Sequence, residues 1–177
     1  MQLLRPGIAL GILLLAPCIA RAAAPDGPAP MLSMLRTTCF GMCPSYRVRL
    51  SSNGHFTFDG LANVTTKGPV DGQATPAQIA AIQAALREAD LRSLHDHYTS
   101  REDGCAPLLM DMSGVKISID DAQGSKTVDF YYGCRGAIAN QVRPRIDKLA
   151  DVIDQQLDTA RWIGKPSKPG APGGTAH

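Results

Sequence analysis

The sequence predicts an α+β fold in the order ββ(β)-α-ββ-α, an antiparallel sheet of two hairpins with two helices packed on one face. Two segments that alternate apolar and polar residues around a turn predict the hairpins. Apolar residues at helical spacing follow each of these segments and predict the helices. Strands with one apolar face and helices with one apolar stripe bury each other most simply as two layers.

The segment Met1–Ala22 is expected to be a secretory signal peptide with a small-x-small cleavage site. Arg5 precedes an apolar run over residues 8–19, and these roughly 12 residues fall short of the roughly 18 that a membrane span requires. A membrane anchor is therefore the weaker alternative. Lipidation at Cys18 is another, although a proline precedes this cysteine. We expect an exported chain, periplasmic or secreted, with no stable membrane span after signal cleavage.

The charge of the expected mature chain is zero. Cleavage after Ala22 would remove Arg5 and Arg21, so the 18 Lys and Arg residues less these two equal the 16 Asp and Glu residues. A neutral domain without a stripe of Lys and Arg lacks the electrostatic footprint of proteins that bind nucleic acid. No nucleic-acid partner is expected.

Composition predicts the domain boundaries. Residues 23–33 are rich in Ala and Pro and are expected to be a flexible N-terminal segment, and residues 164–177 a disordered tail of Pro, Gly and Lys. Residues 34–163 between them are expected to form a single α+β domain.

The first predicted hairpin contains a Ser-Asn-Gly turn that ends at Gly54. A three-residue loop with this glycine in the left-handed conformation would pair Leu50 with Phe56 and Val48 with Phe58. A two-residue Asn-Gly loop would instead mix apolar and polar residues on each face. We therefore expect the three-residue loop.

A weaker third strand is predicted within Asn63–Val70, with Val64 and Thr66 in it. It is expected to lie at the edge of the sheet and to end at Gly68-Pro69.

The first helix is predicted to begin after Thr75. The sequence Thr75-Pro76-Ala77-Gln78 is a capping box with proline at the first helical position. The apolar face of this helix consists of Ile79, Ile82, Leu86 and Ala89.

The second hairpin is predicted from apolar residues that change phase at Ser113-Gly114, which indicates a β-bulge. A turn over Asp121–Lys126 would then keep the apolar residues on one face. The expected pairs are Ile119 with Val128, Ile117 with Phe130 and Val115 with Tyr132.

The last predicted element is a helix over about residues 137–160, in which Pro144 should lie in the first turn or cause a kink.

With both helices on one face, the other face of the sheet would be exposed to solvent. We expect a plain solvated face there, with a partner surface as the alternative. Its predicted residues have mixed charge: Arg47, Arg49, Thr57, Asp59, Lys116, Ser118, Asp129 and Tyr131.

Four cysteines follow the leader, Cys39, Cys43, Cys105 and Cys134, and in an oxidising compartment they are expected to form two disulfides. We favour Cys39 with Cys43, which are close in sequence, and Cys105 with Cys134, which would clamp a hairpin. A redox dithiol is the alternative for the first pair, but its three intervening residues and the strand that follows favour a static bridge. A zinc site of four cysteines is less favoured.

His95 and His97 are weak candidate metal ligands, because in an extended segment both would project to the same side. Without a firm third ligand, a polar loop is favoured. No Gly-x-Ser-x-Gly elbow, glutamate pair or phosphate-binding glycine loop accompanies them. We therefore expect no catalytic residue and no cofactor.

The string Cys39-Phe40-Gly41-Met42-Cys43-Pro44-Ser45-Tyr46, with Arg36 before it and Leu94-x-Asp96-x-Tyr98 after the first helix, resembles the bacterial domain-of-unknown-function 6438 family. The resemblance covers about residues 35–163 and implies an exported domain without an assigned activity. The recurrent positions that it implies are Arg36, Phe40, Gly41, Pro44, Tyr46, Asp96 and Tyr98. The two histidines are not among them, which further weakens the metal hypothesis.

From these observations we predict a non-catalytic module that binds an unknown protein or a cell-envelope partner. The alternative is a thiol-redox activity, or a metal-dependent activity that uses His95 and His97.

Overall fold

The computed structural model describes residues 30–164. The expected signal peptide with Cys18, residues 23–29 of the expected N-terminal segment and residues 165–177 of the expected tail lie outside the described residues. Within the described range, no helix is long and apolar enough to cross a membrane.

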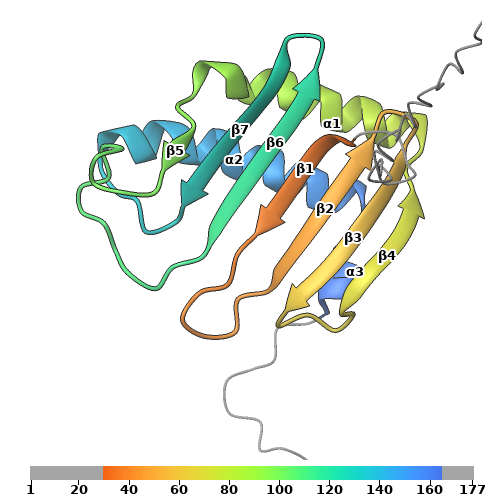
Figure 1. Cartoon of the computed structure of the whole chain (residues 1–177), viewed down its shortest axis with the longest axis horizontal. Helices are drawn as coiled ribbons and strands as arrows, with labels where there is room; N and C mark the ends of the chain where they lie inside the picture. The colour runs from red at the N-terminus through yellow and green to blue at the C-terminus, as the bar shows by residue number, and fades with distance from the viewer. Residues whose placement is uncertain (1–29, 165–177) are drawn as a thin grey trace, which may run out of the picture.

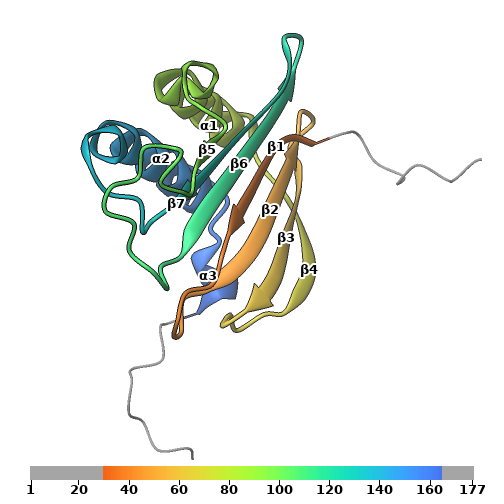
Figure 2. The same cartoon turned by 60° about the vertical axis from the view of Figure 1, so that its left-hand side comes forward.

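The fold is a seven-stranded sheet with helices on one face, which confirms the predicted α+β class (Figures 1 and 2). The strand order is β4-β3-β2-β1-β6-β7-β5, and every neighbouring pair is antiparallel except β5 and β7. The strands are β1 (Pro30–Arg36), β2 (Ser45–Ser51), β3 (His55–Ala62), β4 (Gly68–Gln73), β5 (His97–Tyr98), β6 (Gly114–Asp121) and β7 (Gly124–Tyr131). The helices are α1 (Pro76–Ala89), η1 (Leu91–Ser93), α2 (Ala137–Gln156) and α3 (Ala160–Ile163).

Strand β1 joins the two hairpins into one sheet, because it pairs with β2 on one side and β6 on the other. The prediction that residues 23–33 are a flexible segment and that the domain begins at residue 34 is wrong from Pro30 onward, because β1 begins there. Leu32 and Met34 are buried beneath the helices, but Leu35 on the opposite face interrupts the alternation. Because this alternation is short and imperfect and follows an Ala- and Pro-rich stretch, it did not predict strand β1.

The first hairpin has the predicted register, with Leu50 opposite Phe56 and Val48 opposite Phe58. Gly54 has a φ of 86°, which is the left-handed conformation that the three-residue loop requires. The third strand lies later in the sequence than predicted, because β4 begins at Gly68, where the predicted strand was expected to end. The proline that follows is accommodated because β4 is at the edge of the sheet.

The second hairpin differs from the predicted register by two residues. Ile119 pairs with Lys126 and Ile117 with Val128, because Asp121 already pairs with Gly124 across a tight turn. A shift of two keeps every side chain on its face, so the apolar pattern cannot detect it. The predicted bulge at Ser113-Gly114 is also wrong, since β6 begins at Gly114 and a loop precedes it.

The helices follow the predicted signals in part. The capping box of Thr75 and Gln78 is present at the start of α1. The predicted helix over residues 137–160 is broken, because α2 ends at Gln156 and Asp158 is left-handed with a φ of 50° before α3. Pro144 lies inside α2, beyond its first turn. The face of α2 that packs on the sheet consists of Ala139, Val142, Ile146, Leu149, Ala150 and Ile153.

Candidate functional site

Two of the motif positions, Arg36 and Tyr46, meet Asp154 of α2 between the sheet and the helices. They are opposite each other on β1 and β2. Arg36 Nε donates to Asp154 Oδ2 at 2.9 Å, and the Tyr46 hydroxyl donates to Oδ1 at 2.7 Å. The Thr159 hydroxyl also donates to Oδ1, at 2.8 Å. We call these four residues the Asp154 cluster, and it ties the sheet to the C-terminal helices.

The electrostatics of the Asp154 cluster favour stability over chemistry. Burial by itself would lower the pKa of Arg36, but the charge of Asp154, the neighbouring Tyr46 and Tyr132 and the hydrogen bond to Asp154 together outweigh it, and the pKa is raised. Burial, and then the charge of Asp154, raise the pKa of Tyr46. Burial also raises the pKa of the neighbouring Tyr132 to about 12. At neutral pH the arginine is therefore charged and both tyrosines are protonated. The Asp154 carboxylate already accepts hydrogen bonds from Arg36, Tyr46 and Thr159, so its oxygen atoms are engaged within the cluster.

The structure pairs Cys39 with Cys43 and Cys105 with Cys134, the pairs favoured from the sequence. We call them the short bridge, with a sequence separation of 4, and the long bridge, with a separation of 29. The long bridge lies in the core, where both of its cysteines are 0% exposed. The short bridge lies in the loop between β1 and β2, and both of its cysteines are partly exposed.

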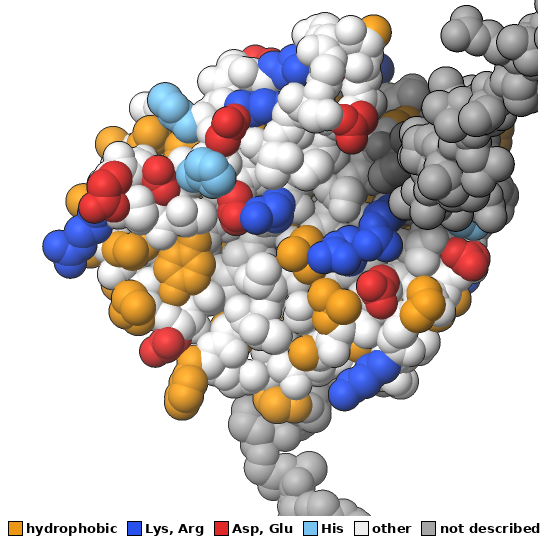
Figure 3. Space-filling model, viewed as in Figure 1, with side chains coloured by type: hydrophobic (Ala, Val, Ile, Leu, Met, Phe, Trp, Pro, Cys, Tyr) orange, Lys and Arg blue, Asp and Glu red, His pale blue; other side chains and the backbone are white. Residues whose placement is uncertain are grey.

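Large exposed apolar side chains of the described residues lie together near one end of the sheet. They belong to the loop of the short bridge, to the loop that precedes β6 and to the end of β3. Phe40 is 89% exposed and Met110 is 72% exposed. These loops lie at the lower side of Figure 1, and Figure 3, in the same view, shows orange apolar side chains toward the lower edge of the molecule. The set, which we call the end patch, consists of Phe40, Met42, Leu61, Leu109, Met110 and Met112.

Hydrogen bonds of backbone and side-chain groups hold the loops of the end patch in place. Phe40 N donates to Asp111 O at 3.0 Å, which extends the antiparallel arrangement of β1 and β6 beyond the strands. Met112 N donates to the Tyr131 hydroxyl at 2.9 Å. The Asn63 side chain donates to the carbonyl of Cys43 at 3.1 Å. The apolar side chains therefore project from loops that the rest of the fold positions.

A hollow of about 330 Å³ adjoins the end patch on the open face of the sheet. Apolar side chains form much of its lining, and Asp129 adds a carboxylate that is paired with Lys116 at 2.8 Å. The hollow is large enough for a single side chain of a partner. Its lining residues are Thr37, Thr99, Leu108, Met110, Gly114, Asp129 and Tyr131.

The rest of the open face has the mixed charge that the sequence predicted. Oppositely charged residues are opposite each other across the strands, as Arg47 is to Asp59 and Lys116 is to Asp129. The Thr57 hydroxyl donates to Asp71 at 2.8 Å. Figure 3 shows blue and red side chains interspersed on this face. Such a face has no field of a single sign that would attract a charged polymer.

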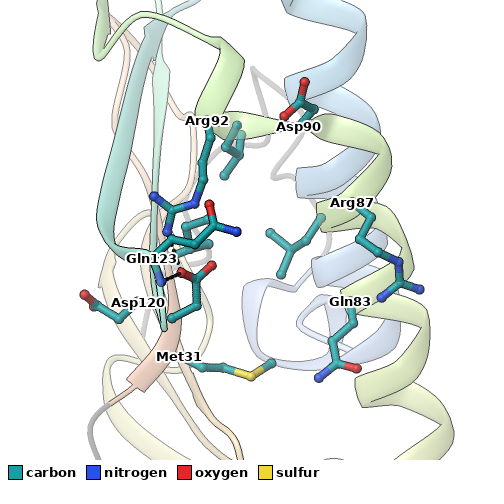
Figure 4. Close-up of a pocket in the computed structure, with 11 residues that line it drawn as sticks. Met31, Gln83, Arg87, Asp90, Arg92, Asp120 and Gln123 are labelled. Carbon is teal, nitrogen blue, oxygen red and sulfur yellow. Dashed lines mark hydrogen bonds and ion pairs between the residues drawn. The ribbon is translucent and has the colours of Figure 1, made fainter.

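A second cavity, the α1 groove, lies between α1 and the β6–β7 hairpin (Figure 4). Its volume of about 440 Å³ is within the range of small-ligand sites. Its floor is apolar, with Met31, Leu86, Leu91 and Ile119. In Figure 4, Arg87 and Asp120 point away from the groove. Arg92 is already engaged by Asp121 at 2.6 Å, so the charged side chains of the rim are not directed at a ligand.

His95 and His97 are exposed at the surface, next to a hollow of about 450 Å³ that Asp96, Glu102 and Asp103 also line. Asp96 is bonded to Lys126 at 2.5 Å, and this interaction lowers the pKa of Asp96. Within residues 30–164, no group of three or more His, Cys, Asp and Glu side chains is placed to hold a metal ion.

Another motif position, Tyr98, is buried, and its hydroxyl accepts a hydrogen bond from His95 N at 2.9 Å. Together with the ion pair of Asp96, this contact positions the segment that leads into β5. These two motif positions therefore have a structural explanation.

Sequence reasoning missed the end patch and Asp154. Met110 and Met112 alternate with polar residues, a pattern typical of a strand, although they lie in a loop. Apolar residues beside the cysteines of two loops were the available signal for the patch. Asp154 gave no signal, because its role depends on β1 and β2, far away in sequence.

Comparison with known families places the chain in a family of unassigned activity. The model of a family described as a domain of unknown function, DUF6438, matches residues 30–156, from the start of β1 to the end of α2. The match therefore includes both disulfides, the Asp154 cluster except Thr159, and the whole end patch. No curated protein matches the chain.

Proposed function

The chain belongs to the DUF6438 family, and we propose that it is an exported, non-catalytic binding module that docks a partner protein through the end patch. The observation that carries the proposal is the gathering of large exposed apolar side chains near one end of the sheet. Large apolar side chains exposed in one region of a surface mark sites of interaction, since their exposure to water is unfavourable. Export is supported by the two disulfides, which persist in oxidising compartments.

The composition of the end patch favours a protein as the partner. Aromatic residues and methionine are enriched in the cores of protein interfaces, and methionine adapts its shape to different surfaces. The patch contains one phenylalanine and three methionines among its six residues. Because hydrogen bonds and a disulfide hold its loops, binding would require little ordering of the chain. The adjoining hollow offers a place for an anchoring side chain of the partner.

Site-specific photocrosslinking in the native host tests the proposal. The photoreactive amino acid benzoylphenylalanine would replace Phe40 or Met110 in the full chain, and Arg49 on the open face or Gln83 beside the α1 groove as controls. We expect a discrete adduct with one partner from the two patch positions and none from the controls. Mass spectrometry would identify the partner and distinguish it from a second copy of this chain. Adducts that arise only from Arg49 or Gln83, or no adduct from the patch, would overturn the proposal.

A further inference from the structure

The two disulfides differ in their exposure, and the more exposed one closes the loop that carries part of the end patch. Both cysteines of the long bridge are 0% exposed, whereas both cysteines of the short bridge are partly exposed. Phe40 and Met42 lie inside the short loop and are 89% and 64% exposed. We propose that the short bridge is a thiol–disulfide exchange site, and that the end patch keeps its docking shape only while this bridge is closed. This inference rests on the proposed function.

The geometry of the short loop explains why the bridge matters. Gly41 has a φ of 134°, so the chain reverses between the two cysteines in a conformation that L side chains rarely adopt. The loop is otherwise attached by the hydrogen bond from Phe40 N to Asp111 O and by the Asn63 side chain, which is exposed. Without the covalent link the loop has more conformations available, and its two apolar side chains can leave their outward positions.

The exchange reaction needs a dithiol as co-reactant, either a small dithiol or a dithiol protein. Its thiolate attacks one sulfur of the short bridge and forms a mixed disulfide, while the other cysteine leaves as a thiolate. The second thiol of the reductant then breaks the mixed disulfide. Two electrons and two protons pass to Cys39 and Cys43, and the reductant becomes a disulfide. The long bridge is shielded from the same attack, because the core encloses both of its cysteines.

Stepwise reduction of the full chain tests the exchange site. The oxidised protein would be treated with increasing dithiothreitol, blocked with iodoacetamide and mapped by mass spectrometry. We expect Cys39 and Cys43 to be alkylated at concentrations that leave the long bridge intact. Hydrogen exchange at the Phe40 amide should then become about tenfold faster, because its bond to Asp111 is lost.

The effect on docking is measured by crosslinking from Met110, which lies outside the short loop. Selective reduction should decrease the adduct about fivefold or more, and C39S/C43S should show the same decrease with no further response to the reductant. Reduction of the long bridge first, or of both bridges together, would overturn the exchange site. Undiminished crosslinking after selective reduction would overturn the proposal that the short bridge controls docking, but it would leave the proposed function intact. No crosslinking in the oxidised chain would remove the proposed function, and this inference with it.

Discussion

The short bridge and the long bridge use the same covalent bond in two different environments. The long bridge is enclosed by the core and joins the loop before β6 to the segment that follows β7. The short bridge closes a loop at the surface, where Phe40 and Met42 are exposed. The number of disulfides therefore does not describe their roles, since we expect the long bridge mainly to stabilise the fold and the short bridge mainly to shape a surface.

Removal of the long bridge is expected to have the largest effect on stability. C105A/C134A should lower the free energy of unfolding by about 3.6 kcal/mol, because the unfolded chain regains the freedom of a long loop. C39A/C43A should lower it by about 2 kcal/mol, because its loop is short. Urea denaturation of both double variants measures the difference. A larger loss of free energy of unfolding in C39A/C43A than in C105A/C134A would contradict the expected difference between the two bridges.

The Asp154 cluster provides a second core interaction for comparison with the surface loop. D154N should lower the free energy of unfolding by about 3 kcal/mol, because the mostly buried Arg36 loses its counter-charge. D151N is the matched control, since Asp151 also pairs with Arg36 but its side chain is 76% exposed. This control should change stability by less than about 0.5 kcal/mol. Equal effects of the two variants in urea denaturation would contradict the role of Asp154.

Stability at high pH tests the same buried region. The pKa of Tyr132 is raised to about 12 in the folded protein, mainly by burial, whereas an unfolded tyrosine ionises near pH 10. The contribution of this tyrosine is therefore fully present below about pH 10 and is lost as the pH rises to about 12. The free energy of unfolding therefore decreases over this pH range, and in Y132F this decrease should be smaller by about 1–2 kcal/mol. Unfolding measured at several alkaline pH values would contradict the prediction if Y132F and the original chain showed the same slope.

Local signals in the sequence were enough for the parts of the fold that depend on near neighbours. Gly54 determines the register of the first hairpin, and Thr75 caps α1 through a residue three positions away. The register of the second hairpin was wrong because a shift of two residues leaves every side chain on its predicted face.

The features that sequence reasoning missed depend on distant partners. Strand β1 is defined by the strands on both of its sides, and Asp154 acts on residues more than 100 positions away in sequence. The end patch includes Phe40 and Met110, whose loops are joined in the folded chain by the hydrogen bond from Phe40 N to Asp111 O. No local pattern contains that contact, so the cysteines were predicted while the surface beside them was not.

The smallest effect on stability is expected from the end patch itself. F40S/M110S should change the free energy of unfolding by less than about 0.5 kcal/mol, because both side chains are largely exposed in the folded protein. The same double change should abolish the adduct formed by benzoylphenylalanine at Met42, another member of the patch. R49S on the open face is the control and should leave that adduct unchanged.

The combination of results separates a docking surface from a structural one. Loss of the adduct with unchanged stability is the result expected of side chains whose partner lies outside the chain. A loss of about 2 kcal/mol or more in the free energy of unfolding would show that Phe40 and Met110 contribute to packing, as core residues do. In that case the loop of the short bridge would belong to the packed fold, and the contrast between a core bridge and a surface bridge would disappear.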